Sequence, residues 1–386
     1  MSGIAFGALA FWLALPPVSA RAPWWPVLAG LLGIAAGIWA VSRGSRRAGW
    51  GAVAVGIIGV GLGILATRSS AGHLDRVVVW SALATGMLVW ATPLTYAAIG
   101  GMVCERSGVV NIGLEGMMLA GAFFGVLGAD KLGSWVWGLL VALAAGAAFA
   151  LLHAFFSVHL RADQIITGTA LNFFALGATG YLFIKIYGAN GSPGNLPRIP
   201  DVPISWLHGI PPHGLGSFLQ STFGQLNLMI WLSFLLLILS YVVVFRTPIG
   251  LRIRSVGEHP LAAETSGVSV YGMRYAATVI SGMLAAAGGA YLSVGFVGSF
   301  NQNMTAGRGF IALAAVIFGN WRPFGAFAAA LLFGGSTALS FRLADIWGNS
   351  AVLFQALPYL LTLIAVAGVI GRSRPPAASG RPYVKQ

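Results

Sequence analysis

Long apolar runs, separated by short polar breaks, make up most of this 386-residue chain. Several runs reach the 18 or more residues that a helix needs to cross a hydrocarbon core about 30 Å thick. The pattern predicts an all-α polytopic membrane protein with about 10–12 transmembrane or half-membrane helices. The apolar runs are residues 4–15, 25–42, 49–67, 77–100, 111–129, 134–157, 164–187, 227–245, 275–297, 309–320, 323–341 and 351–370.

One of these runs, residues 309–320, is too short to cross a bilayer by itself. A helix of this length extends about 18 Å, because each residue adds about 1.5 Å. We therefore expect a half-helix, or one limb of a broken span that packs inside the bundle.

Composition agrees with a membrane protein and excludes several other classes. The chain is 57% hydrophobic and 8% charged, so a soluble domain of this composition would expose large apolar patches. The single cysteine, Cys104, excludes an intrachain disulfide, and the six His show no metal-ligand spacing. A net charge of +13 would suggest nucleic acid in a soluble chain, but here we expect the cations to sort by side of the membrane, with no nucleic-acid partner.

The Lys and Arg residues do sort in this way. With residues 246–274 placed in the cytoplasm and every apolar run crossing once, 14 of them fall inside and seven outside. This excess follows the positive-inside rule. The inner cations lie in residues 43–47, 105–106, 161, 246–274, 322 and 371–386, and the outer ones are Arg21, Arg68, Arg76, Lys131, Arg198, Arg308 and Arg342.

The sequence predicts one transmembrane domain with additions at both ends. We expect an N-terminal extension of two or three further spans (residues 1–70), the main transmembrane domain (71–371) and a basic cytoplasmic tail (372–386). Residues 4–15, followed by small residues, are typical either of a secretory signal or of a short uncleaved first span. The longest connection, 188–226, is rich in Gly and Pro and predicts an irregular outer cap.

Residues 246–274 stand out because they gather charge between two apolar runs. This stretch holds Arg246, Arg252, Arg254, Arg274, Glu258 and Glu264. Gly257 is expected to stop one helix and Pro260 to occupy the first turn of a short new helix, 261–267. Such a helix cannot cross the bilayer, so it either offers a surface to a soluble partner or is an ordinary basic loop that fixes topology.

No residue pattern for catalysis is present in the sequence. Its three lysines lie outside any Gly-rich P-loop, and no Ser/His/Asp or Cys/His spacing occurs. The chain is therefore not expected to be an enzyme or to bind a cofactor directly. If it is an energised transporter, another subunit must hydrolyse ATP for it.

Two polar residues open the run that begins at residue 111. Asn111 and Glu115 are four residues apart, on one side of the predicted helix. They could line a polar pathway between helices. Alternatively, Asn111 caps the helix and Glu115 complements its positive end.

Further candidates for a substrate pathway lie in two other stretches. Thr169, Asn172 and Phe173 place a hydroxyl, an amide and an aromatic ring near mid-bilayer, which suits a flat base and a polyol, although such polar residues also hold helices together. Asn301 and Asn303 precede the predicted half-helix, whose N-terminus would present free N–H groups. An outer loop with ordinary caps is the alternative there.

Three long motifs resemble one family, the permease subunits of ABC importers of the ribose and nucleoside type. They are ERSGVVNIGLEGMMLAGA (105–122), GLRIRSVGEHPLAAETSGVSVYGMRYAATVISGMLAAAGGAYL (250–292) and MTAGRGFIALAAVIFGNWRPFGA (304–326), and the likeness covers about residues 77–371. The first and third look most like the nucleoside-uptake branch. This resemblance implies a second related permease, an ABC ATPase subunit that binds ATP and Mg²⁺, and an extracytoplasmic nucleoside-binding lipoprotein, in a bacterial cytoplasmic membrane.

The resemblance also implies a coupling helix around residues 255–267 that fits a cleft in the ATPase. The residues carried over to this role are Arg252, Arg254, Ser255, Gly257, Glu258, His259, Pro260, Ala263, Glu264 and Gly267. Residues 1–70 have no counterpart in the likeness. A permease for ribose or another simple sugar, and a self-sufficient secondary carrier, remain the alternatives.

Overall fold

The computed structural model describes residues 24–43, 49–57, 59–60, 79–188, 191, 195–205, 207, 215–346, 356 and 374–385. The chain divides into two compact units, Met1–Ala84 with Ala338–Gly371, and Thr85–Thr337 with Arg372–Gln386. The candidate site lies entirely in the second unit. The domain boundaries predicted at residues 70–71 and 371–372, the run 4–15 and nearly all of the run 351–370 lie outside the described residues.

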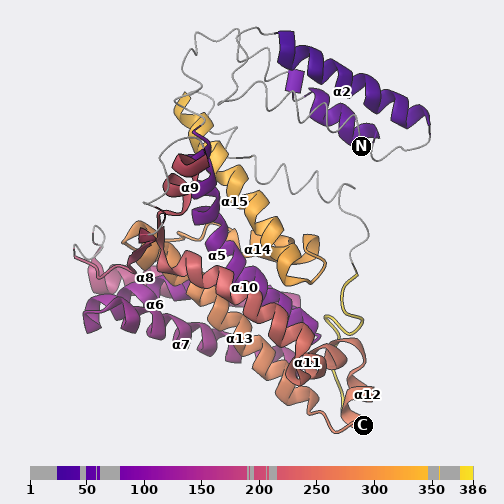
Figure 1. Ribbon diagram of the computed structural model, residues 1–386. Coiled ribbons are helices and arrows are strands. Elements are labelled where there is room, and N and C mark those ends of the chain that lie inside the picture. Colours follow the sequence, from indigo (N-terminus) through magenta and orange to yellow (C-terminus); the bar gives the residue numbers. More distant parts are fainter. Residues whose placement is uncertain are drawn as a thin grey trace. The chain divides into compact units, whose positions relative to one another are not determined.

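The predicted all-α polytopic fold is confirmed. In the part of the chain that the structure describes, six helices are long and apolar enough to cross a membrane (Figure 1). They are α5 (Trp80–Arg106), α7 (Trp135–Ala154) with its π-helical continuation η1 (Phe155–His159), α8 (Gln164–Tyr187), α10 (Leu228–Arg246), α13 (Val270–Ala290) with η3 (Tyr291–Val297), and α15 (Pro323–Ile346). A further apolar helix, α6 (Leu114–Leu132), is almost entirely buried among them.

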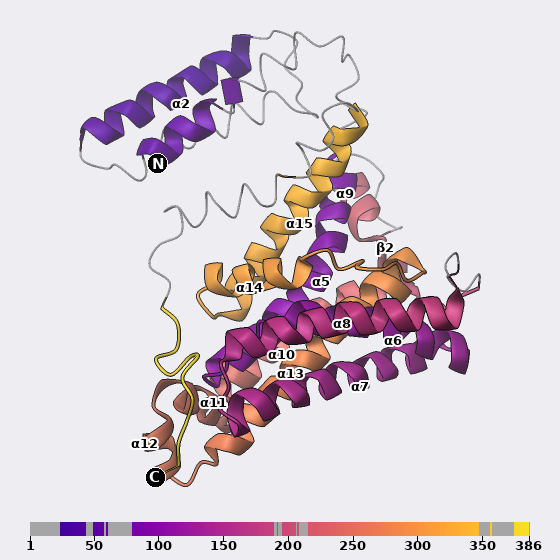
Figure 2. The same ribbon diagram turned by 180° about the vertical axis from the view of Figure 1, so that it is seen from behind.

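Small residues let α6, α7 and α13 approach very closely. A Cβ atom on Gly121 of α6 would lie 2.3 Å from the Ala286 backbone of α13, and one on Gly146 of α7 would lie 2.3 Å from Gly282 O. Lipid supplies no hydrophobic force between helices, so this close van der Waals packing stabilises the bundle. The three helices run side by side in Figure 2.

Several of the segments that the charge pattern places in the cytoplasm, all within the second unit, meet at one end of that unit. The end of α5 contacts the turn between α14 (Arg308–Phe318) and α15, where both Arg106 Nε and Nη2 donate to Trp321 O. Gly380 N of the C-terminal segment donates to Gly108 O at 3.2 Å. We call this end the inner end. It also holds α11 (Pro248–Glu258) and α12 (Pro260–Thr265), which lie near the C-terminus in Figure 1.

Helix α14 is the short helix that the apolar pattern predicted, and with 11 residues it forms half a span. Residues 298–307 lead down to it from the end of η3 as turns. Arg308, which the charge pattern predicts to lie outside, has its guanidinium 5.0 Å from the centre of the Trp90 ring. Trp90 lies ten residues into α5, or about 15 Å from its start. The irregular stretch and α14 therefore make one crossing together.

The opposite, outer end carries the long connection after α8. Two three-residue strands, β1 (Asp201–Pro203) and β2 (Gln225–Asn227), pair antiparallel with Asp201 opposite Asn227. Helix α9 (Leu215–Phe223) precedes β2. These short elements match the predicted irregular cap.

In the first unit, α2 (Trp24–Ser42) packs against the helical residues 49–57 through paired glycines. A Cβ on Gly37 would lie 2.7 Å from Gly49 O, and one on Gly56 would lie 2.8 Å from Gly30 O. Two apolar helices that cross on glycines form a stable pair in lipid.

Candidate functional site

The half-helix α14 is held at its N-terminus by a buried carboxylate from α6. Glu115 Oε1 accepts hydrogen bonds from Thr305 Oγ1 at 2.6 Å and Gly307 N at 2.8 Å, and Oε2 accepts from Gly309 N at 2.6 Å. Glu115 is 8% exposed. Free N–H groups at a helix start carry partial positive charge, so an anion is stabilising there.

Glycines make this close approach possible. A Cβ on Gly309 would lie 2.4 Å from Glu115 N, so a larger residue would push α14 away from α6. Gly307, just before the helix, has a φ of +84°, which favours glycine. The sequence TAGRG therefore shapes a pocket for one carboxylate.

The other end of α14 is held by the last two residues of α5. Trp321 Nε1 donates to Glu105 Oε2 at 2.5 Å, and the Arg106 guanidinium donates to Trp321 O at 2.8 and 3.0 Å. Trp321 has a positive φ of 52°, an unusual backbone for a bulky residue, which these contacts fix. The first and third sequence motifs thus contact each other at both ends of α14.

The prediction that Asn111 caps α6 is wrong, because the N-cap is Gly113 and has no side-chain cap bond. Asn111 Nδ2 instead donates to Ser281 Oγ of α13 at 3.0 Å. The first turn of α6 is capped across the bundle by Asn172 of α8, whose Oδ1 accepts from Gly116 N at 2.7 Å and whose Nδ2 donates to Ile112 O at 3.0 Å. Likewise, Glu115 complements the N-terminus of α14 as well as its own helix.

The remaining pathway candidates are not brought together. Thr169 and Phe173 lie on the exposed side of α8, where Thr169 Oγ1 donates to Ile165 O of its own helix and Phe173 is 71% exposed. Asn301 and Asn303 are exposed in the turns before α14. The N–H groups expected to be free at the start of α14 are occupied by Glu115.

The stretch 246–274 folds as two short helices, and the expectation that Gly257 stops a helix was wrong. Helix α11 starts at Pro248 under a cap from Thr247 and continues through Gly257 to Glu258. Gly257 is needed for a close approach, because a Cβ there would lie 2.1 Å from Arg106 O. The coupling stretch therefore rests directly on the end of α5.

The predicted second helix is confirmed with shifted bounds, since α12 begins at Pro260 and ends at Thr265. Gly267 follows with a φ of +81°, as expected after a helix C-terminus. Between α11 and α12 lies an open groove of about 510 Å³. Its lining includes Arg252, Ser255, Glu258, His259, Ala262 and Ala263.

Several coupling candidates make contacts within the chain. Arg254 lies 5.3 Å from the centre of the Phe245 ring, and Ser255 Oγ donates to Arg252 O. Glu258 and Glu264 accept hydrogen bonds from the C-terminal segment, Glu258 from Ala377 N and Glu264 from the Tyr383 hydroxyl. Arg252 and His259 are exposed.

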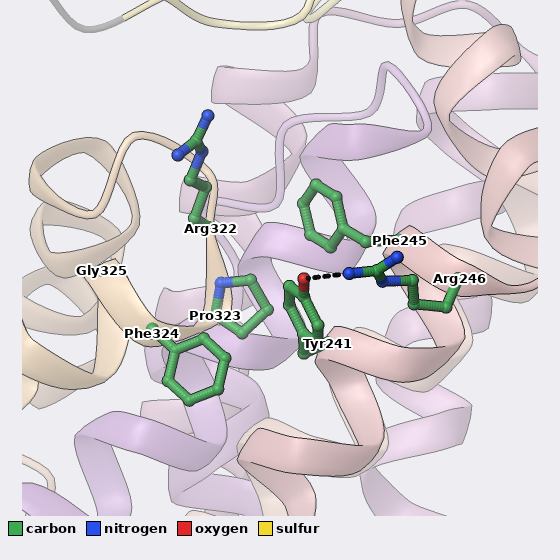
Figure 3. Close-up of a pocket in the computed structure, with 7 residues that line it drawn as sticks. All are labelled: Tyr241, Phe245, Arg246, Arg322, Pro323, Phe324 and Gly325. Carbon is green, nitrogen blue, oxygen red and sulfur yellow. Dashed lines mark hydrogen bonds between the residues drawn. The ribbon is translucent and has the colours of Figure 1, made fainter.

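A larger cavity, of about 650 Å³, opens between α10 and the start of α15 at the inner end. Figure 3 shows the rings of Tyr241 and Phe324 close to one another on its wall, with Phe245 beside them. Arg246 donates to the Tyr241 hydroxyl at 3.2 Å, and Arg322 reaches the opposite side. The cavity combines flat apolar surfaces with guanidinium donors.

A second cavity, of about 430 Å³, lies at the outer end beside the two-stranded sheet. Asn227 holds this region together, because its Nδ2 lies within 3.3 Å of Ile199 O, Asp201 Oδ1 and Gly295 O. Arg198 and Asp201 both line it. Among the described residues, no group of His, Cys, Asp and Glu could hold a metal ion.

Sequence reasoning missed the contacts of Thr305, Trp321 and Tyr383. Thr305 and Trp321 lie inside the third motif, so their positions were visible, but their partners are about 190 and 216 residues away in the chain. Tyr383 lies in a tail that composition alone describes only as basic.

Comparison with known proteins shows the family to which the chain belongs. Residues 83–366 match the family described as branched-chain amino acid transport system / permease component. The chain is 42% identical to the guanosine ABC transporter permease protein NupQ of Bacillus subtilis over 331 residues, which cover 81% of this chain and 99% of that protein. It is 39% identical to the nucleoside ABC transporter permease protein NupC of Lactococcus lactis, covering 78% of this chain and 96% of NupC.

A more distant relative is the glucose ABC transporter permease protein TsgB13 of Haloferax volcanii. It is 29% identical over 296 residues, which cover 73% of this chain and 75% of that protein. No solved structure matches the chain.

Proposed function

Because the chain belongs to the family of branched-chain amino acid transport system permease components, we propose that it is the membrane-spanning permease subunit of an ABC importer for nucleosides. Two relatives with the highest identities given above are named for guanosine and nucleoside transport. As a multi-pass membrane protein it would act in a bacterial cytoplasmic membrane, bound to an ATPase subunit, a second related permease and an extracytoplasmic nucleoside-binding lipoprotein.

The observation that supports a permease driven by an ATPase is the connection from α11 to α14. Gly257 of α11 rests on Arg106 O, and Arg106 in turn holds Trp321 at the end of α14. A displacement of α11 and α12 by an ATPase would therefore be transmitted to a half-helix inside the membrane through direct contacts. Discontinuous helices of this kind commonly form gates and binding sites in transporters.

The chain itself supplies no chemistry in this mechanism. ATP and Mg²⁺ would bind to the ATPase subunit, and the permease would convert the closure of that subunit into movement of α14. Release of Trp321 from Glu105 would free the lower end of α14, while Glu115 would keep its upper end on α6. The half-helix would then pivot, exposing the pathway to one side at a time.

We place the inner mouth of the pathway at the cavity beside α10 and α15. Tyr241, Phe245 and Phe324 offer flat rings for a nucleobase, and Arg246 and Arg322 offer donors for its oxygen and nitrogen atoms. The cavity adjoins the α14–α15 turn, so movement of α14 would change its width.

Uptake by reconstituted liposomes tests this function. The chain would be purified with its ATPase, second permease and lipoprotein, and ATP-driven uptake of labelled guanosine measured with unlabelled guanosine, cytidine, ribose, glucose and leucine as competitors. We expect the nucleosides to compete and the sugars and leucine to have no effect. Equal competition by leucine, or uptake that needs no ATPase, would contradict the proposal.

A simple sugar is the second candidate substrate, because the relative TsgB13 is named for glucose transport. Competition by glucose or ribose, without competition by nucleosides, would favour it.

A further inference from the structure

The last described residues, 374–385, form a strap across the inner end. Arg374 N donates to Asn320 Oδ1 at 3.0 Å, beside the end of α14. Ala378 N donates to Gly257 O of α11 at 2.8 Å, and the Arg274 guanidinium of α13 donates to Arg381 O at 2.9 Å. The strap therefore joins elements that are far apart in the chain.

Tyr383 completes a small hydrophobic core beneath the coupling helices. This core consists of Val256 from α11, Ala263 from α12, Val270 from α13 and Tyr383, which is 4% exposed. The Tyr383 ring packs edge-on against Tyr271 at 5.4 Å between ring centres. Without Tyr383, Val256, Ala263 and Val270 would lose much of their burial.

The Tyr383 hydroxyl fixes the strap to α12. It donates to Glu264 Oε2, and burial together with this hydrogen bond raises the pKa of Tyr383 to about 12. The hydroxyl thus remains a donor throughout the physiological range. The prolines at 375, 376 and 382 restrict the unfolded strap, which lowers the entropy lost when it is ordered.

We propose that the strap, residues 374–385, is a permanent part of the ATPase-docking surface, which it stiffens and makes basic. This inference rests on the proposed function. Glu258 and Glu264 accept hydrogen bonds from the strap, so they hold the surface together from within. The strap in turn adds the exposed cations Arg374, Arg381 and Lys385 to the exposed Arg252 of α11.

The partner that fits this surface is an ATPase cleft lined with Asp and Glu. Cations outnumber carboxylates on α11, α12 and the strap, so attraction to an acidic cleft would speed and orient docking, and salt would weaken it. An ATPase whose cleft is basic would not fit.

The test is capture of the ATPase by the full permease pair, with the affinity tag on the second permease. We expect Tyr383→Ala to lower ATPase recovery about tenfold at unchanged recovery of the chain itself, because a stiff docking surface reduces the ordering that binding requires. Val384→Ala is the matched control, since Val384 is the next residue and is 52% exposed. Wild-type ATPase recovery with Tyr383→Ala, or increased recovery as expected for an inhibitory strap, would overturn the proposal.

A charge-reversal variant tests the proposal even if Tyr383→Ala fails to fold. Arg381→Glu changes an exposed side chain and leaves the backbone hydrogen bonds of this residue in place. We expect it to lower ATPase recovery and to reduce the salt dependence of capture. Arg161→Glu, at another exposed site of the inner end, is its control and should leave capture unchanged. If Arg381→Glu behaves like Arg161→Glu, the basic surface is not used.

The two proposals can fail separately. Wild-type complexes that capture ATPase through the strap but import no nucleoside would refute the nucleoside function alone. Complexes that import nucleoside normally with Tyr383→Ala would refute the strap alone.

Discussion

The two ends of α14 are held by different chemistry, and the contrast shows how a half-helix can be both anchored and movable. At the N-terminus a single buried carboxylate, Glu115, accepts three hydrogen bonds from groups at residues 305–309. At the C-terminus Trp321 is shared between Glu105 and Arg106. The first end is fastened to α6 deep in the bundle, whereas the second is fastened next to the coupling helices.

This difference suggests a fixed end and a driven end. The Glu115 contacts are enclosed by α6 and α14, so breaking them would expose several buried donors at once. The Trp321 contacts involve one indole N–H and one carbonyl, and their partner Arg106 also touches α11 through Gly257. We therefore expect the pivot to move at Trp321 rather than at Glu115, because the Trp321 end is joined through Arg106 to the helix that an ATPase would displace.

The largest effect is expected from loss of the fixed end. Glu115→Ala leaves three donors without their acceptor, which would destabilise the protein by on the order of 3–5 kcal/mol. We expect little folded protein, measured as the monodisperse fraction in detergent and its thermal unfolding temperature. Glu258→Gln is the control, because an amide at this exposed position still offers an oxygen that accepts from Ala377 N, and it should unfold like the wild type.

A smaller, functional effect is expected at the driven end. Trp321→Phe removes the N–H that binds Glu105 but keeps the carbonyl that binds Arg106, so the fold should persist. We expect uptake to fall about tenfold, as for the loss of one buried hydrogen bond, while ATP hydrolysis continues. A parallel loss of ATPase activity and uptake would show that Trp321 serves docking rather than movement of α14.

The support of the fixed end gives the next smaller effect. Asn172→Leu removes the cap on Gly116 N and the partner of Ile112 O, at a cost of about 1–2 kcal/mol. We expect a lower unfolding temperature. An unchanged unfolding temperature with reduced uptake would instead support the prediction that Asn172 lines the substrate pathway.

The smallest effect is expected on the exposed face of the same helix. Phe173→Ala and Thr169→Val change exposed side chains of α8, so the free energy of unfolding should change by no more than about 0.5 kcal/mol. A large loss of uptake in either variant, at normal stability, would show that this face meets substrate or the second permease.

Much of the fold could be predicted from the sequence because lipid constrains it simply. The apolar runs matched the helices from α5 to α15 closely, and the charges grouped the segments that meet at the inner end. The short run near residue 309 was expected to be half a span, and α14 is.

The contacts of the site were harder to predict, since they depend on pairs distant in the chain. Asn111 and Asn172 were both identified as polar residues inside helices, but only the packed bundle shows that Asn172 caps α6 and Asn111 does not. A glycine such as Gly257 is typical of a helix C-terminus, yet here the lack of a side chain is what allows the close approach to Arg106 O. Polarity can be seen in a sequence, but the direction in which a side chain points cannot.

The single carboxylate at the start of α14 also bears on how this family can diverge. Glu115 lies in the first turn of α6 and at the start of α14, so one anion neutralises two positive helix termini. In a relative without this anion, the two positive helix termini would lie close together with no compensating negative charge. Substitutions at positions 115 and 305 are therefore expected to be inherited in pairs, because loss of the acceptor at 115 leaves the donor at 305 without a partner.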